Sequence, residues 1–178
     1  FKKNLIKEIS SLGHEIGYHY ESLSDTNGNI TEAINDFKKN LGILREIVPI
    51  KTCAMHGRPL KKFDNRDMWR IKENHDFLLK ELGILGEVYL DISYKNIAYI
   101  NDTGRNWESN KSNKRDKVIS NIKTSFESQK LLISYLEKTD IKKIVFQIHP
   151  ERWDDNYFSW VLQLIIDKLS NFIKKLIK

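Results

Sequence analysis

Residues 15–21 read EIGYHYE, a short run in which apolar and polar side chains alternate. Alternation with a period of two is typical of a β-strand that is buried on one face. A helical pattern precedes this run over residues 1–12, and the turn signal Asn-Gly-Asn follows it at residues 27–29. We therefore expect a strand over 15–21 that carries His19 near its end, on the same face as Glu21.

The chain on the C-terminal side of this strand continues to alternate between strand and helix patterns. Strands are predicted over 50–55, 85–92, 96–100 and 143–148, and helices over 30–47, 66–82, 119–136 and 155–178, with Thr31 as a cap and residues 101–115 as a polar loop. Strands separated by helices of this length favour parallel pairing and an α/β fold. With 178 residues and neither a repeat nor a linker, we expect one domain over 1–178.

The composition is that of a globular chain with enough apolar residues for a core. It is 40% hydrophobic and 30% charged, and its 8 Gly and 3 Pro argue against a low-complexity chain. Its one cysteine, Cys53, excludes an internal disulfide and a Cys-rich zinc site. A single cysteine also favours a reducing compartment, so we expect a cytoplasmic protein.

The charge pattern bears on possible partners. The net charge of +6 comes from lysines scattered along the chain, and the densest patch, residues 114–117, includes an acid. Because no zinc finger or RNA-recognition motif is present, we expect no nucleic-acid partner. The longest apolar stretch, residues 160–177, is interrupted by polar and charged residues, so no transmembrane segment is expected. We expect the C-terminal helix that contains this stretch to pack on the protein's own sheet rather than on a membrane surface.

Three of the five histidines, His19, His56 and His149, fall at the ends of predicted strands. The carboxyl ends of parallel strands form the active-site face of α/β folds. Imidazole binds zinc and also transfers protons near neutral pH. The three histidines are therefore either members of one site or hydrogen-bonded structural residues. Their spacing does not show which of them would bind a metal and which would act as a general acid. Cys53 lies at the opposite parity to His56, which argues against a Cys-His nucleophile.

Arginine and tryptophan side chains lie close to these histidines in the sequence. Each of the three arginines could bind a carboxylate, a phosphate or sugar hydroxyls, or could pair with a nearby acid of the chain. The arginines are Arg58, Arg105 and Arg152, and the acids are Asp64, Asp102 and Glu151. Trp107 and Trp153 are candidates for stacking on a sugar ring, whereas Trp69 and Trp160 are expected in the core.

Five short segments together resemble a known family. GHEIGYH (13–19), MHGRPL (55–60), DNRDMW (64–69), DTGRNW (102–107) and IHPERW (148–153) occur in this order. The first is similar to the GHEIGxH segment of polysaccharide deacetylases, the NodB-homology superfamily (carbohydrate esterase family four). The whole set resembles a bacterial branch of that superfamily whose members tend to be associated with surface-polysaccharide genes.

The resemblance implies a fold and an activity. The fold would be a distorted (β/α) barrel of the polysaccharide deacetylase type, here missing its first strand or strands. The activity would be hydrolysis of N- or O-acetyl groups on a sugar by water bound to a divalent metal, usually zinc. The partner implied is a carbohydrate substrate of surface-polysaccharide metabolism.

The resemblance also implies roles for individual residues. His19 matches the first metal-binding histidine of the family, and His149 matches the histidine that protonates the leaving group. Arg58 lies where the family has its Arg-x-Pro motif. The segment with Asp102, Arg105 and Trp107 lies where the family has the wall of its sugar site, and we add Arg152 and Trp153 as neighbours of His149 that could bind substrate.

The sequence also departs from the family. The second metal-binding histidine would fall at Leu23, which cannot bind a metal, so we expect its place to be taken by His56 from the neighbouring strand end or by Glu21, which shares a face with His19. The family's metal-binding Asp and base Asp precede the first helix, so the resemblance places them upstream of Phe1 and implies an incomplete catalytic set in this chain. The alternative is a catalytically inactive relative that binds carbohydrate or acts as a scaffold.

Overall fold

The computed structural model describes residues 2–58, 60–70, 72–103, 107 and 115–176. The chain forms two compact units, Phe1–Ile92 and Ser93–Lys178, and each is described here by itself. The prediction of one domain over 1–178 stays a prediction.

The first unit contains a three-stranded parallel sheet in the order β1-β2-β3. The strands are β1 (Tyr18–Tyr20), β2 (Thr52–Met55) and β3 (Gly86–Glu87). In β1 the two tyrosines are buried and His19 is exposed, as the alternating pattern predicts. The register pairs His19 with Ala54, and the main-chain N–H of His56 donates to the Tyr20 carbonyl at 2.9 Å. Parallel pairing therefore brings His19 and His56 to the same end of neighbouring strands.

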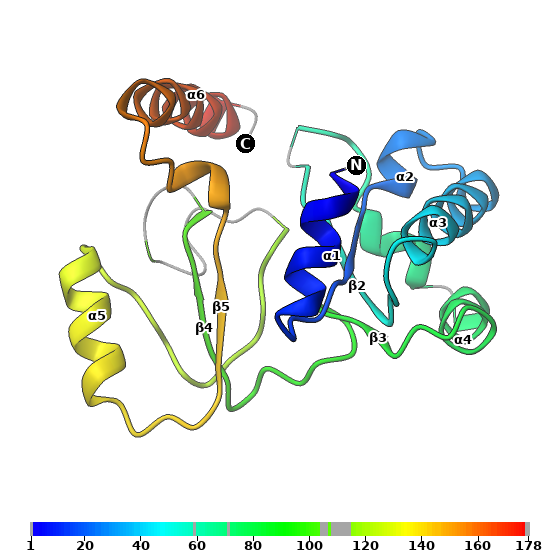
Figure 1. The fold of residues 1–178 in the computed structure, drawn as a ribbon, viewed down its shortest axis with the longest axis horizontal. Helices are drawn as coiled ribbons and strands as arrows, with labels where there is room; N and C mark the ends of the chain where they lie inside the picture. Colours follow the sequence, from blue (N-terminus) through cyan, green and yellow to red (C-terminus); the bar gives the residue numbers. More distant parts are fainter. Residues whose placement is uncertain (1, 59, 71, 104–106, 108–114, 177–178) are drawn as a thin grey trace. The chain divides into compact units, whose positions relative to one another are not determined.

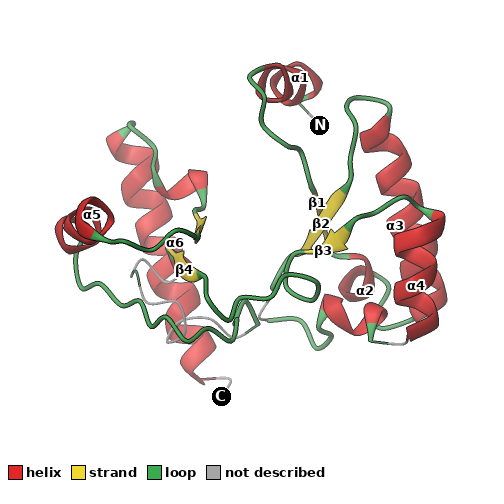
Figure 2. Cartoon of the chain, turned by 90° about the horizontal axis from the view of Figure 1, so that it is seen from below, coloured by secondary structure: helices red, strands yellow, loops and turns green. Residues whose placement is uncertain are grey.

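Helices pack around this sheet, and all of them except α1 contribute buried residues to the core. They are α1 (Lys3–Ser11), α2 (Ser22–Asp25), α3 (Ile30–Arg45), the 3-10 helix η1 (Asn65–Trp69) and α4 (Lys72–Glu81). Figure 2 shows α3 and α4 on one side of the sheet. The apolar face of α3 is buried as its spacing predicts, but Asn29 rather than Thr31 caps the helix, because the Asn29 side chain accepts from the Glu32 N–H at 3.2 Å.

The second unit is built on a two-stranded parallel sheet. The strands are β4 (Ala98–Asn101), which is buried throughout, and β5 (Ile144–Gln147). The helices are α5 (Gln129–Lys138), the 3-10 turn η3 (Pro150–Arg152) and α6 (Tyr157–Leu176). Figure 1 shows β4 beside β5, with η3 following directly from β5 and leading into α6. The turn thus returns the chain toward the carboxyl ends of both strands.

The predicted helix over 119–136 is wrong in its first half. Residues 119–127 are irregular, and α5 begins only after Ser128, whose hydroxyl accepts from the Leu131 N–H. Side chains hold the irregular segment against β4: the Ser120 hydroxyl donates to the Ile97 carbonyl and the Thr124 hydroxyl donates to the Tyr99 carbonyl, each at 2.7 Å. These long-range bonds compete with a helix and favour an extended path.

The predicted strand over 85–92 is also shorter than expected, since β3 spans two residues and a turn follows. The cause is Glu87, whose buried carboxylate accepts from the main-chain N–H groups of Met55, Tyr89 and Leu90. Tyr89 and Leu90 lie two and three residues after Glu87, so the chain turns around the Glu87 side chain instead of continuing the strand.

The mixed α/β class and the parallel pairing are as predicted. The described part of the chain forms two small sheets and no closed barrel. Within that same part, no helix combines the length and the apolar character that a membrane crossing requires.

Candidate functional site

The first candidate site lies where β1 and β2 end. His19 Nδ1 lies 3.0 Å from the Ala54 carbonyl oxygen, and the His56 ring is next to it, with 5.0 Å between the ring centroids. A carbonyl only accepts hydrogen bonds, so Nδ1 of His19 must carry the proton. In the neutral ring the lone pair is then on Nε2, the nitrogen through which the ring can bind a metal or a proton.

His56 is oriented in the same way by a carboxylate. Its Nδ1 is hydrogen-bonded to Glu21, and Glu21 also pairs with Arg58, which in turn pairs with Asp25. Arg58 has a φ of 30°, in the left-handed region that residues with side chains seldom adopt. The Glu21 side chain is 30% exposed and that of His56 47% exposed, so this cluster is open to solvent.

A buried amide holds the main chain beneath this cluster. Asn65 is fully buried; its Nδ2 donates to the His56 carbonyl at 2.9 Å, and its Oδ1 accepts from the Ser24 N–H at 2.8 Å. The 3-10 helix that contains Asn65 is capped by Asp64, whose side chain accepts from the Arg66 N–H at 3.0 Å. Asn65 therefore fixes the end of β2 relative to α2.

The two histidines fit two positions of a metal site. Two imidazoles on one tetrahedral zinc, each with a Zn–N bond of about 2.0–2.1 Å, have ring centroids about 5 Å apart. The separation of His19 and His56 agrees with this value. Ligating histidines commonly donate their other N–H to a carbonyl or a carboxylate, as both do here. In the described residues, however, no third His, Cys, Asp or Glu completes a metal-holding group.

The second candidate site lies where β4 and β5 end in the second unit. Asp102 follows β4 directly, and His149 follows β5 after one residue. The Asp102 carboxylate is buried; its Oδ1 is hydrogen-bonded to His149 Nδ1, and its Oδ2 accepts from the His149 main-chain N–H at 3.0 Å. A carboxylate accepts from Nδ1–H, so the lone pair of the neutral His149 ring is again on Nε2.

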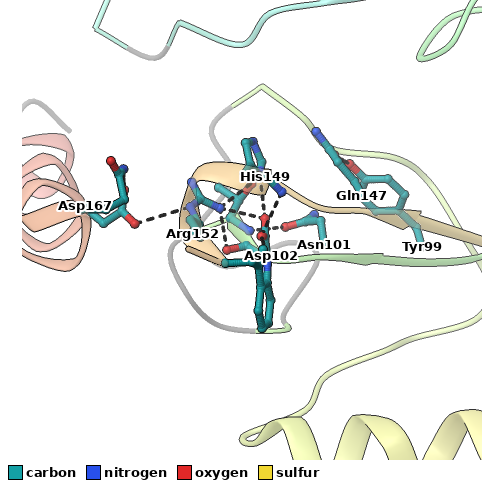
Figure 3. A network of polar contacts seen from close by, with 10 residues as sticks. Tyr99, Asn101, Asp102, Gln147, His149, Arg152 and Asp167 are labelled. Atoms are coloured by element: carbon teal, nitrogen blue, oxygen red, sulfur yellow. Dashed lines mark hydrogen bonds and ion pairs between the residues drawn. The ribbon is translucent and has the colours of Figure 1, made fainter. Parts of the chain in front are cut away.

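The turn η3 adds two more donors to the same carboxylate. Arg152 Nη1 donates to Asp102 Oδ1 at 2.8 Å and to the Asp102 main-chain oxygen at 2.7 Å. Trp153 Nε1 donates to Asp102 Oδ2 at 3.1 Å. Figure 3 shows Asp102 between His149 and Arg152, with Asp167 of α6 on the far side of Arg152. One buried carboxylate thus holds three side chains in place.

These contacts set the charge state of Asp102. Burial alone would raise its pKa, but the hydrogen bonds from the side chain and main chain of His149, together with the charge of Arg152, outweigh burial and lower the pKa below its ordinary value. Asp102 is therefore ionised near neutral pH. An ionised Asp102 accepts from His149 Nδ1 and so fixes the orientation of the ring, as proton transfer at Nε2 requires.

A pocket of about 260 Å³ opens beside this network. It is lined by Asp102, Trp107, Gln129, Arg152, Trp153 and Trp160. The Trp107 ring stacks on the Trp153 ring with 5.5 Å between centroids, and on Phe146 at the same distance. Stacked indoles that also present polar edges are suited to the faces and hydroxyls of a sugar ring.

The predicted site residues fall into two groups. His19, His56 and Arg58 lie in the first unit, whereas Asp102, Trp107, His149, Arg152 and Trp153 surround the network of the second. Arg105 lies outside the described residues. Leu23 is a core residue, 2% exposed, in agreement with its inability to bind a metal.

Several residues of these sites were not found from the sequence. Asn65, Asp167 and Gln129 were missed. Trp69 is buried as expected, but the prediction that Trp160 lies in the core is wrong, because its side chain is 36% exposed and lines the pocket. Of the expected ion pairs, Arg152 with Asp102 is confirmed, but Arg58 pairs with Glu21 and Asp25 while Asp64 pairs with Arg66. An isolated acid in the mostly apolar stretch of α6 was the one local signal for Asp167.

Comparison of this chain with protein-family models, with curated proteins and with solved structures gives no match.

Proposed function

We propose that this protein is a metal-dependent carbohydrate deacetylase that removes N- or O-acetyl groups from a sugar in surface-polysaccharide metabolism. The observation that carries the proposal is the Asp102–His149 pair beside a tryptophan-lined pocket. The ordered motifs that resemble the NodB-homology superfamily support the same activity. We further propose that the parallel strands belong to a distorted (β/α) barrel of that type, and that the protein acts in the cytoplasm.

In this proposal His19 and His56 hold a divalent metal, zinc by preference, through Nε2. A metal held there would polarise the acetyl carbonyl as a Lewis acid and would lower the pKa of a bound water. The Ala54 carbonyl and Glu21 keep both rings in the tautomer that ligation requires.

His149 acts as the general acid. Its Nδ1–H donates to ionised Asp102, so the protonated ring presents Nε2–H to the amine or alkoxide that leaves the acetyl group. Asp102 does not itself give up a proton in this scheme, because its lowered pKa keeps it ionised. Trp153, which is 47% exposed, would provide the face on which the sugar stacks, and the buried Trp107 ring packs against Trp153.

The test uses the longest form of the protein that its gene encodes, loaded with zinc. Acetate release from N-acetylglucosamine oligomers and from an O-acetylated glycan is measured for the wild type, His149→Ala and His14→Ala, the last as a control at an exposed histidine. We expect His149→Ala to lose at least about 100-fold on the acetamide. It should lose much less on 4-nitrophenyl acetate, whose leaving group needs no acid.

Acetate release that is absent from every substrate and zinc-loaded preparation would contradict the proposal. So would an equal loss on the acetamide and on the nitrophenyl ester in His149→Ala, since a general acid matters most for the poor leaving group.

A second candidate function is carbohydrate binding without catalysis, on a deacetylase-like scaffold. The burial of Leu23, where the family has a second metal-binding histidine, favours it. In that case the pocket of the second unit would bind acetylated saccharides in a calorimeter, and neither added zinc nor His19→Ala would change the affinity.

A further inference from the structure

Asp167 lies in α6, outside every segment that resembles the deacetylase family. Its Oδ2 is 3.4 Å from Arg152 Nε, and its Oδ1 accepts from Gln163 Nε2 at 3.1 Å. Both partners of the ion pair are largely buried, with side chains 12% and 13% exposed. The contact is an ion pair rather than a hydrogen bond, because Arg152 Nε makes no hydrogen bond in the described structure.

Arg152 is thus held at two edges of its guanidinium group. One edge donates to Asp102 through Nη1, and the other faces Asp167 through Nε (Figure 3). The guanidinium is planar and rigid, so carboxylates at two edges fix both its position and its orientation. With one of them removed, the group can rotate about the remaining contact.

The orientation of Arg152 affects His149. Arg152 Nη1 lies 3.0 Å from His149 Nδ1, and because both atoms carry protons, both must converge on Asp102 rather than bond to each other. A rotated guanidinium would move into the space of the ring or leave Asp102 with one donor fewer. Either change would weaken the hydrogen bond that orients His149.

We propose that Asp167 is a positioning residue that anchors Arg152, so that Arg152 holds Asp102 and, through it, the ring of His149. The catalytic consequence rests on the proposed function. The geometric consequence does not, because the hydrogen bond between His149 and Asp102 can be observed without any substrate.

The first experiment observes that hydrogen bond by NMR. The Nδ1–H resonance of His149, assigned by its absence in His149→Gln, is recorded for wild type, Asp167→Asn, Asp167→Glu and the exposed control Asp155→Asn. We expect exchange of this proton with water to be roughly tenfold faster in Asp167→Asn, with Asp167→Glu close to the wild type and Asp155→Asn unchanged. An unchanged exchange rate in Asp167→Asn overturns the proposal.

A double-mutant cycle tests whether Asp167 acts through Arg152. We expect the His149 Nδ1 proton to exchange no faster in the double variant Arg152→Lys, Asp167→Asn than in Arg152→Lys alone, since lysine cannot bridge the two carboxylates. Additive effects would overturn the proposal. If Asp167→Asn does not fold, Gln163→Leu replaces it, and we expect exchange of the His149 Nδ1 proton to be roughly threefold faster in that variant. An exchange rate equal to that of the wild type would then overturn the inference.

Kinetics separate this inference from the proposed function. With acetylated glucosamine oligomers, we expect Asp167→Asn to lower kcat roughly tenfold and to change KM less than about twofold. A faster proton exchange in a protein that deacetylates nothing would support the positioning role and reject the enzyme. A protein that deacetylates these oligomers but whose His149 resonance is unchanged in Asp167→Asn would support the enzyme and reject the positioning role.

Discussion

Two histidines in this chain, His56 and His149, each follow a parallel strand and each donate from Nδ1 to a carboxylate, yet the two carboxylates are built differently. Glu21 is 30% exposed and holds His56 together with Arg58. Asp102 is 3% exposed and accepts from the ring and main chain of His149, from Arg152 and from Trp153.

The difference separates two tasks that one side chain can perform. A histidine with a solvated partner can adjust its ring, which suits a ligand that must fit its metal. A histidine whose carboxylate partner is buried and accepts from several donors has a fixed ring orientation, which suits proton transfer. We therefore expect changes at Asp102 to cost stability and catalysis together, and changes at Glu21 to affect mainly the site.

The largest effect is expected from Asp102→Asn. The amide would direct an N–H toward groups that are themselves donors, and would remove one of the two largely buried carboxylates that pair with Arg152. We expect the free energy of unfolding of the second unit to fall by about 3 kcal/mol, measured by urea denaturation followed by tryptophan fluorescence. Asp140→Asn, at an exposed position, is the control. A loss below about 1 kcal/mol would remove the contrast between the two carboxylates.

Asn65→Ala should have the next largest effect, in the first unit. It removes two buried hydrogen bonds, to Ser24 and to His56, so we expect a loss of about 2 kcal/mol in urea denaturation. Because Asn65 fixes the end of β2, zinc affinity measured by competition with a chelator should weaken roughly tenfold. Asn35→Ala on the exposed side of α3 should change neither. An unchanged zinc affinity would mean that Asn65 does not position His56.

Stability should depend on pH with opposite sign at one buried carboxyl group of each unit. The pKa of Asp102 is below its ordinary 3.8, so its stabilisation is complete above that value and is lost as pH falls through the lowered pKa. Burial raises the pKa of Glu87 above its ordinary 4.5, against the opposing hydrogen bonds from Met55, Tyr89 and Leu90. The fold therefore favours neutral Glu87, and stability decreases as pH rises from 4.5 through the raised pKa.

Unfolding free energies measured from about pH 3 to about pH 7 check both signs. The difference between wild type and Asp102→Asn should narrow toward acid. Relative to Glu87→Gln, the wild type should lose stability as pH rises. The same sign for both carboxyl groups would show that their surroundings do not differ as described.

Glu21→Gln should have the smallest effect on stability. The amide oxygen can still accept from His56 Nδ1, and the ion pair with Arg58 that is lost is partly exposed. We expect the free energy of unfolding to fall by less than about 1 kcal/mol, and the main consequence to be a weaker zinc affinity. A loss as large as that of Asp102→Asn would mean that the two carboxylates do the same work.

Local pattern predicted the parts of this molecule that local physics decides. The alternation around His19, the strand before His149 and the apolar face of α3 each follow from a period of two or of three to four residues. The meeting of His19 with His56 follows from parallel pairing alone.

The remaining features depend on bonds between distant residues, which leave no periodic trace. Ser120 and Thr124 hold an extended path because their partners lie 23 and 25 residues away, in or beside β4. Glu87 ends a strand by accepting from the N–H groups that would have continued it. The link from Asp167 to Arg152 joins a helix to a turn, and in the sequence it is merely an acid among apolar residues.

The measurement that tests the central claim most directly is the zinc content of the longest form of the protein that its gene encodes, beside His19→Ala, His56→Ala and the exposed control His14→Ala. We predict about one zinc per chain in the wild type and in His14→Ala, and loss of the metal in each of the other two variants. A wild type that binds no zinc after reconstitution, or the same zinc content in all four proteins, would contradict the assignment of His19 and His56 as ligands.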